Sequence, residues 1–145
     1  MIKELVIPSE IYEEILKHCS AEYPREACGV AASNEEVRDG RSCEIKKIYP
    51  MKNVSDTPRL CYLIDPEEQL QVFKKIRQEG LELCGIYHSH ANTEAFPSAK
   101  DLELAFYPSA AYVIVSFAKG RQEPVLRAFN ILNNKDISEI KVVRK

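Results

Sequence analysis

The sequence predicts an α/β domain with a central mixed β-sheet and helices on its faces, and three observations lead to this fold class. Helical and strand patterns alternate along the 145 residues, an order that favours a sheet covered by helices. The run 83–87 is apolar on both alternating sets, as expected for a strand that is buried on both sides. The length fits one domain, residues 1–145, and suffices to bury a core without a disulfide or a structural metal.

The first helix is predicted from apolar residues that recur at helical spacing. Ile11, Ile15 and Cys19 belong to one face, while charged residues dominate the other face. We expect Ser9 to cap the N-terminus of this helix. The helix should end near Pro24, because proline cannot continue it.

The strands are predicted from apolar, β-branched and turn-forming residues. In the first half, strands are expected over 28–32, 43–49 and 60–64, with a polar turn region over 34–41 and a surface loop over 50–58. The second half adds the run 83–87, a strand over 112–117 and, after the segment 124–132, a terminal edge strand over 137–143. Parallel and antiparallel neighbours are therefore both expected.

Two further helices lie between these strands. We expect Asp65 to be the N-cap of the clearer one, with Pro66 as its first residue and Glu68 as the reciprocal partner of a capping box. Gly80 should end this helix. A shorter helix is expected from residue 98 to about residue 107, just before a proline.

The charge pattern argues against nucleic acid or a membrane as partner. Twenty Lys and Arg oppose 22 Asp and Glu, and no segment clusters basic with aromatic residues. The first residues carry both signs of charge without a following apolar region, so no secretory signal is expected. The longest apolar stretch, around 110–118, is too short to cross a bilayer.

The cysteines point to a reducing compartment. They are five in number, widely spaced and never arranged as CxxC, which argues against a disulfide framework and a thiolate zinc ribbon. We therefore expect them to be packing residues of a cytoplasmic protein.

Two histidines and a carboxylate that follow the run 83–87 form a candidate zinc site. His88 and His90 are two apart at a strand end, so both imidazoles project from one face. Ser98 and Asp101 are three apart at a helix start and share a helical face. Two imidazoles and one carboxylate leave the fourth zinc position open, as in hydrolytic sites. Ser98 and Asp101 equally suit the N-cap and N3 positions of the helix.

The full spacing of these residues resembles the signature of the JAMM (MPN-type) metallopeptidase family. The signature runs His-Ser-His, seven residues, Ser, two residues, Asp, and the upstream Glu26-Ala27-Cys28-Gly29 matches its Glu-x-Cys-Gly element. The resemblance covers nearly the whole chain and is strongest to the small stand-alone prokaryotic members. Ala91 stands where many members carry proline, which bears on the stiffness of the loop.

This resemblance implies a deaminase-like α/β/α sandwich and a zinc-dependent peptidase or isopeptidase. It implies that His88, His90 and Asp101 bind zinc. It also implies that Glu26 acts as general acid/base and that Ser98 helps to stabilise the oxyanion. The implied substrate is the Gly-Gly tail of a small ubiquitin-like sulfur-carrier protein. The identity of the carrier, the peptide or isopeptide nature of the bond, the released adduct and the oligomeric state stay open.

Two other protein classes are alternatives to a peptidase. The first is a non-catalytic MPN-type scaffold that binds proteins, although the sequence lacks none of the expected ligands. The second is a nucleobase deaminase, which requires HxE followed by PCxxC. Neither of these motifs occurs in the chain.

Overall fold

The computed structural model describes residues 1–35 and 41–145 of the chain. The strands are β1 (Glu4–Ile7), β2 (Cys28–Ser33), β3 (Ser42–Glu44), β4 (Lys47–Met51), β5 (Glu82–His90), β6 (Ala111–Ser116), β7 (Val125–Leu132) and β8 (Asp136–Arg144). The helices are α1 (Ser9–Glu22), α2 (Pro66–Gln78) and α3 (Ala99–Glu103). Most of the expected turn region 34–41 lies outside the described residues. Among the described helices, none is long and apolar enough to cross a membrane.

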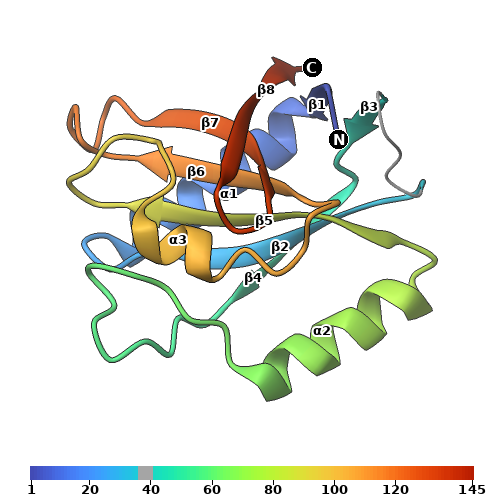
Figure 1. The fold of residues 1–145 in the computed structure, drawn as a ribbon, viewed down its shortest axis with the longest axis horizontal. Coiled ribbons are helices and arrows are strands. Elements are labelled where there is room, and N and C mark those ends of the chain that lie inside the picture. The colour runs from blue at the N-terminus through green and yellow to red at the C-terminus, as the bar shows by residue number, and fades with distance from the viewer. Residues whose placement is uncertain (36–40) are drawn as a thin grey trace.

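The described strands form one mixed sheet in the order β3-β1-β8-β7-β6-β5-β2-β4 (Figure 1). β5 runs parallel to β6 and antiparallel to β2, so the expected mixture of strand directions is confirmed. α3 lies in the connection between the parallel strands β5 and β6. In open α/β sheets, ligands bind at the carboxyl ends of such strands. The end of β5 is therefore the natural place for a site.

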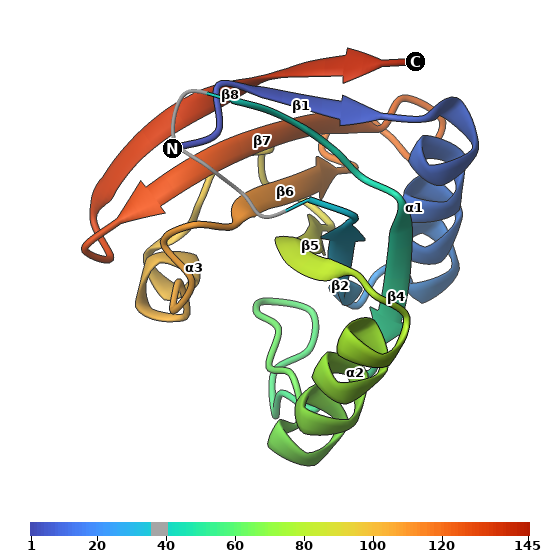
Figure 2. The same cartoon turned by 90° about the vertical axis from the view of Figure 1, so that its right-hand side faces the viewer.

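Helices cover both faces of the curled sheet, which confirms the predicted α/β/α arrangement (Figure 2). On one face, Ile11 and Ile15 of α1 pack into a cluster of buried residues with β1 and β8. On the other face, Ile76 of α2 joins a second cluster with Ile86 of β5 and Ile114 of β6. Each fully buried side chain of this kind contributes about 1.5 to 3 kcal/mol to folding. Both faces of the central strands are thus held by apolar packing.

The expected strand over 43–49 is two strands in the structure. β3 and β4 lie at opposite ends of the sheet order, so a single continuous strand is wrong. The chain changes direction between them. Ile45 donates its N–H to the Val6 carbonyl (3.0 Å), whereas Lys46 donates to the Ala32 carbonyl (2.8 Å). Successive residues thus pair with different strands, a switch that the local sequence does not signal.

The expected strand over 60–64 is also wrong. Only Ile64 pairs in this segment, in an isolated bridge with Asn53. The Asn53 side chain supplies hydrogen bonds that a strand partner would otherwise make: its Oδ1 accepts from the Leu63 N–H (3.0 Å) and its Nδ2 donates to the Cys61 carbonyl (3.1 Å). A side-chain amide therefore holds a segment that forms only this isolated bridge.

The terminal strand does not lie at an edge of the sheet. β8 pairs antiparallel with β7 and parallel with β1, so its assignment as an edge strand is wrong. β1 was not expected as a strand. It is only four residues long, and its partners on β8 start at Lys141, near the other end of the chain. Because the pairing partner of β1 is so distant in sequence, no pattern within residues 4–7 indicates this strand.

The helix caps follow the predictions only in part. Pro8, not Ser9, is the cap residue of α1, and Ser9 Oγ accepts a hydrogen bond from Arg144 (3.0 Å) instead of capping the helix. In α2, Asp65 accepts from the Glu68 N–H as predicted. Glu68 itself does not complete a capping box, because its carboxylate accepts from the Lys52 N–H (3.0 Å). In both cases the side chain that was expected to cap its own helix accepts a hydrogen bond from a residue outside that helix.

α3 is shorter than the expected helix over 98–107. It ends at Glu103, and the Asn134 amide donates to the carbonyls of Leu102 (2.8 Å) and Ala105 (3.2 Å). Asn134 belongs to the turn between β7 and β8. This distant side chain satisfies carbonyls at the helix end and so ends the helix one turn early.

Candidate metal site

Two buried histidines end β5. His88 and His90 alternate on the strand and lie on the same face as Ile86, beneath α3. They are 1% and 2% exposed. The neighbouring strand β6 runs parallel, with His90 in register with Ser116, so the histidines lie at the carboxyl edge of the parallel pair. This placement confirms the expectation that both imidazoles share a face.

α3 brings Asp101 to the histidines through a capping box. Ser98 Oγ accepts from the Asp101 N–H (3.1 Å), and Asp101 Oδ2 accepts from the Ser98 N–H (2.9 Å). The same Oδ2 atom lies 3.0 Å from Nε2 of His88 and 3.0 Å from Nε2 of His90. The capping role of Ser98 and the approach of Asp101 to the histidines therefore coexist, because the two reciprocal bonds orient the carboxylate.

The three donor atoms form an almost equilateral triangle. The two Nε2 atoms lie 3.1 Å apart, and each is 3.0 Å from Asp101 Oδ2. Ligand atoms bound tetrahedrally to zinc at about 2.0 to 2.1 Å lie roughly 3.3 Å apart. The triangle thus has nearly the size of one face of such a tetrahedron, and the donor set fits a zinc ion.

The tautomer of His90 strengthens this reading. Its Nδ1 lies 2.9 Å from the Glu94 carbonyl, which can only accept, so Nδ1 carries a proton. In the neutral ring, Nε2 then presents a lone pair toward the carboxylate of Asp101. Two lone pairs at 3.0 Å repel each other unless a cation lies between them. A metal ion or a second proton on His90 supplies that cation.

The pKa shifts of His90 and Asp101 also favour a positive charge between these two side chains. Burial lowers the pKa of His90, but the Asp101 carboxylate and the Glu94 carbonyl outweigh burial and raise it overall. For Asp101, burial raises the pKa, but the two histidines and the Ser98 N–H hold it well below its usual range. Burial lowers the pKa of His88. The cluster therefore keeps Asp101 ionised and His88 neutral, the forms that bind metal.

Glu26 completes a buried four-residue cluster. One ligand atom each from Glu26, His88, His90 and Asp101 lies within 4.8 Å of the others. Glu26 is 4% exposed, and its Oε1 has no hydrogen-bond partner within the described part of the chain. Burial raises its pKa, His90 lowers it and Asp101 raises it again, with a result of about 8. Such a carboxyl exchanges its proton near neutral pH.

This raised pKa predicts a pH-dependent stability for the chelator-treated protein. Between 4.5 and about 8 the folded chain keeps the Glu26 proton, whereas the unfolded chain loses it. The contribution of Glu26 to the free energy of unfolding therefore falls as the pH rises through that window. Relative to Glu26→Gln, we expect the free energy of unfolding of the wild type to fall by a few kcal/mol from about pH 5 to about pH 9. Urea unfolding at stepped pH measures the difference, and a difference independent of pH would contradict it.

The contacts of Ala27 and Gly29 explain why these residues follow Glu26 in the Glu-x-Cys-Gly motif. The Ala27 N–H donates to Ser89 Oγ (2.8 Å), and the Ser89 N–H donates to the Ala27 carbonyl (3.1 Å). Ser89, between the two histidines, thereby fixes the start of β2 beside them. At Gly29, an added Cβ would lie 2.5 Å from the Tyr87 ring on β5. Only glycine leaves room for this ring, so the motif sets how closely β2 and β5 approach.

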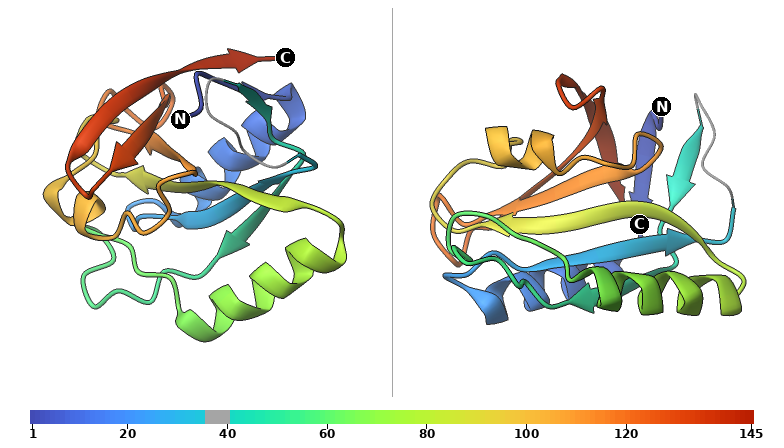
Figure 3. Two further views of the ribbon diagram at one scale, coloured as in Figure 1. Left: turned by 45° about the vertical axis from the view of Figure 1, so that its right-hand side comes forward. Right: turned by 60° about the horizontal axis from the view of Figure 1, so that its bottom comes forward.

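Several residues of the site carried no signal in the sequence. Tyr62 stacks on His88, with ring centroids 4.5 Å apart and planes at 26°. His88 Nδ1 has no hydrogen-bond partner among the described residues, so the stacking on Tyr62 adds to the Nε2 contact with Asp101 in orienting the ring. Asn53 holds the segment on which Tyr62 lies. These residues come from the connection between β4 and α2, whose green trace lies at the sheet end where β5 finishes (Figure 3).

Other candidate residues lie outside the cluster. His18 is half-buried and its Nδ1 is 2.7 Å from the Tyr87 hydroxyl, so it is a boundary histidine as expected. The five cysteines are unpaired, and all but Cys61 are buried. Cys84 lowers the pKa of its neighbour Cys43 to about 7.

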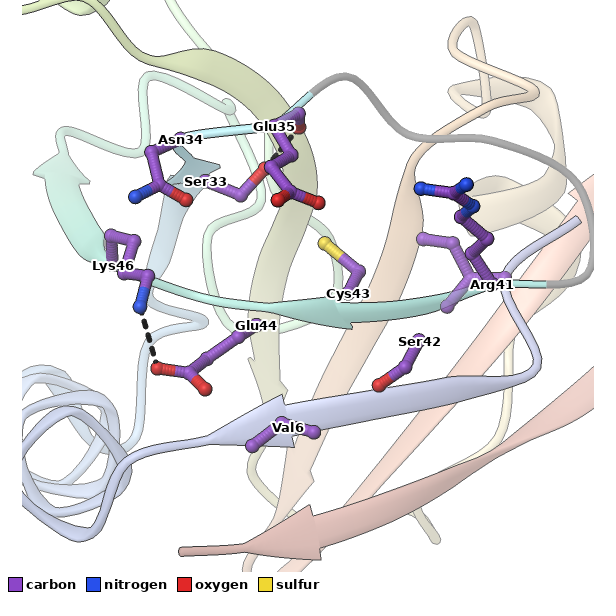
Figure 4. A pocket seen from close by; sticks show the side chains of 10 residues that line it. Val6, Ser33, Asn34, Glu35, Arg41, Ser42, Cys43, Glu44 and Lys46 are labelled. Carbon is purple, nitrogen blue, oxygen red and sulfur yellow. Dashed lines mark hydrogen bonds and ion pairs between the residues drawn. The ribbon is translucent and has the colours of Figure 1, made fainter.

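A polar pocket of about 230 Å³ is lined by residues of β1 and β3 and by the end of β2, among others (Figure 4). Cys43 and Glu35 are among its lining residues, and an ion pair joins Glu44 to Lys46 at 2.8 Å. The pocket shares no lining residue with the four-residue cluster. The pocket is therefore separate from the candidate metal site.

Together, the fold and the cluster define an α/β protein with a buried group of two histidines and two carboxylates that could hold a metal ion. Residues 8–132 match the family model described as prokaryotic homologs of the JAB domain. This match spans most of the chain. The chain therefore belongs to the prokaryotic JAB family, and the predicted resemblance to JAMM (MPN-type) proteins is confirmed.

Similar proteins support the same assignment. The chain is 35% identical over 129 residues to the CysO-cysteine peptidase of Mycobacterium tuberculosis, covering 89% of this chain and 84% of that protein. It is 33% identical over 116 residues to a desampylase of Haloferax volcanii, covering 77% and 80%. A solution structure from Desulfitobacterium hafniense is 35% identical, with a TM-score of 0.83 over 97% of this chain and 92% of that chain.

Proposed function

We propose that this chain is a zinc-dependent peptidase or isopeptidase that hydrolyses the amide bond after the C-terminal Gly-Gly tail of a small ubiquitin-like sulfur-carrier protein. The observation that carries this proposal is the triangle of His88, His90 and Asp101 donor atoms beside the buried carboxyl group of Glu26. Metal ligands and an adjacent proton-exchanging carboxyl are the two requirements of metal-assisted amide hydrolysis.

Three residues would hold the metal. His88 and His90 contribute Nε2, and Asp101 contributes Oδ2. When bound, a zinc ion supplies a Lewis acid and lowers the pKa of a water molecule toward about 7. Glu94 fixes the His90 ring through its carbonyl, and Tyr62 fixes the His88 ring by stacking. Such outer contacts keep the donor atoms aimed at one point.

Glu26 would move the protons. One of its carboxylate oxygens lies within 4.8 Å of the ligand atoms of the other three residues, and in the metal-free chain burial raises its pKa, which suits a group that takes a proton and returns it. It would accept a proton from the attacking water and donate it to the amine that leaves the glycyl carbonyl. The same side chain would thus carry out both proton transfers of the hydrolysis.

Ser98 would donate to the developing oxyanion. Its Oγ accepts from the Asp101 N–H, which leaves the hydroxyl proton free to donate. Capping and oxyanion stabilisation therefore use different parts of the same hydroxyl.

Ser98→Ala is expected to lower kcat by about 10² to 10³ through the lost oxyanion donor. It should also cost about 1 kcal/mol of stability through the lost cap. Ser98→Gly is the matched control, because glycine removes the same hydroxyl yet costs a helix cap only a few tenths of a kcal/mol. Steady-state kinetics and thermal unfolding separate the effects. An unchanged kcat in both variants would reduce Ser98 to a cap.

The proposed substrate follows from the relatives. One is named a peptidase for CysO-cysteine and another a desampylase. A glycine-rich tail can reach a buried cluster because it has no side chains to clash, and an extended tail can pair with a strand. We also propose that residues 1–145 form a single domain and that the unpaired cysteines place it in the cytoplasm.

Two experiments test the function. Zinc content after purification without added metal should approach one ion per chain, and dipicolinate should remove both the ion and the cleavage of a carrier fused through Gly-Gly. Glu26→Gln should then retain uncleaved conjugates from native lysate, which mass spectrometry identifies. A reconstituted protein that holds no zinc would refute the peptidase and favour the scaffold alternative. All four cluster residues are present, so nothing in the site favours that alternative.

A further inference from the structure

We propose that Asn53 is a positioning residue of this site: its side-chain amide fixes the backbone of Glu26 and of the segment that holds Tyr62 against His88. The inference rests on the proposed function for its kinetic consequences. Asn53 itself is distant in sequence from all four residues of the cluster.

The Asn53 amide joins two separate parts of the chain. Its Nδ2 donates to the Glu26 carbonyl (2.9 Å) and to the Cys61 carbonyl (3.1 Å). Its Oδ1 accepts from the N–H groups of Ser55 (3.0 Å) and Leu63 (3.0 Å). Every donor faces a carbonyl and the acceptor faces amides, so the orientation of the amide is unambiguous.

The hydrogen bonds of Asn53 lie immediately beside Tyr62 and Glu26. Cys61 and Leu63 flank Tyr62, so the amide grips the backbone on both sides of the residue that stacks on His88. The Glu26 N–H donates to the Pro58 carbonyl of the same segment (2.7 Å). The backbone of Glu26 is therefore bound at its N–H by Pro58 and at its C=O by Asn53.

Packing alone does not hold the segment. Between residues 54 and 63, Tyr62 is the only buried residue, and the others are exposed or partly exposed. Few buried apolar contacts mean a low local free energy of opening unless polar contacts replace them. The amide of Asn53 supplies these contacts. If it is lost, Glu26 and Tyr62 can shift together, and a misplacement of about 1 Å can cost about 10² in rate.

Two variants test the two halves of the amide. Asn53→Ala removes all its bonds, while Asn53→Asp keeps an acceptor for Ser55 and Leu63 but places an oxygen against the Glu26 carbonyl. We expect both to lower kcat by about 10- to 100-fold with little change in KM. The matched control is Asn130→Ala on β7, which removes a buried amide that donates to the Ile2 carbonyl (2.9 Å). It should lose stability but keep its kcat where it is fully folded.

A double-mutant cycle separates positioning from general destabilisation. In a Glu26→Gln background, adding Asn53→Ala should lower the residual rate by clearly less than it does in the wild type, because Glu26, one of the two groups that Asn53 positions, is already lost. A full 10- to 100-fold further loss would overturn the proposal.

Amide hydrogen exchange of the chelator-treated protein tests the inference without catalysis. In Asn53→Ala, the Glu26 and Leu63 amides should exchange at least about tenfold faster, while the Val113 amide in β6 keeps its rate. Asn130→Ala should not show this selective change. Unchanged exchange at Glu26 and Leu63 would overturn the positioning role. Absence of zinc-dependent cleavage in the wild type would instead refute the proposed function and leave the exchange result to decide the role of Asn53.

Discussion

Replacing Glu26 with glutamine is expected to lower kcat by about 10² to 10⁴ while zinc content stays unchanged. Glutamine has nearly the same shape and keeps an acceptor oxygen, but it cannot take a proton from water. Glu26 Oε1 has no partner to lose among the described residues, so the substitution breaks no hydrogen bond made by that atom. The loss should therefore appear in kcat, with KM for the conjugate nearly constant.

The matched control for this prediction is Glu67→Gln on α2. Glu67 is exposed and lies outside the cluster, so the variant removes one carboxylate from the chain without touching the site. Its kcat and zinc content should equal those of the wild type. Initial rates with a fluorescent Gly-Gly conjugate, together with elemental analysis of the same samples, measure both quantities. If Glu26→Gln kept its full rate, another group would have to move the proton.

Replacing Asp101 with asparagine is expected to abolish zinc binding and to lower kcat/KM by on the order of 10³ or more. Asp101 Oδ2 is the atom shared by both histidines and by the Ser98 N–H. Asparagine can still accept from Ser98, so the helix start should survive. The neutral amide, however, removes the negative charge that compensates a divalent cation.

Glu103→Gln on the same helix is the control for Asp101→Asn. Glu103 is exposed and pairs only with Lys100 (3.2 Å) among the described residues, so its loss removes the same charge from α3 but leaves the triangle intact. We expect one zinc ion per chain in this variant and none in Asp101→Asn. Full zinc occupancy in Asp101→Asn would show that the carboxylate is not a ligand, whatever its effect on the rate.

Much of the candidate site could be predicted because its residues follow local periodicities. The spacing of two between His88 and His90 sets their common face on a strand, and the spacing of three between Ser98 and Asp101 sets theirs on a helix start. Both patterns are confirmed, as is the capping box that they imply. The central strands were predicted for the same reason, since continuous apolar runs mark strands that are buried on both faces.

These failures share one physical cause, which is that a polar group was satisfied by a partner outside its own helix or strand. Ser9 bonds to Arg144 rather than to its own helix. The segment 60–64 bonds to the Asn53 side chain rather than to a strand. β1 pairs with β8 across almost the whole chain. Local propensity is similar for these alternatives, so only the tertiary contacts select one.

Residue types and spacings were therefore enough to predict which groups form the site and on which faces they lie, because residue chemistry and the periods of strand and helix are local properties. The packing of the strands and helices contributed what was missing. It brought Glu26 to within 4.8 Å of the histidines and Asp101, buried the four together, and thereby raised the pKa of Glu26 to about 8. Distance and burial depend on how strands and helices pack, and no local pattern encodes them.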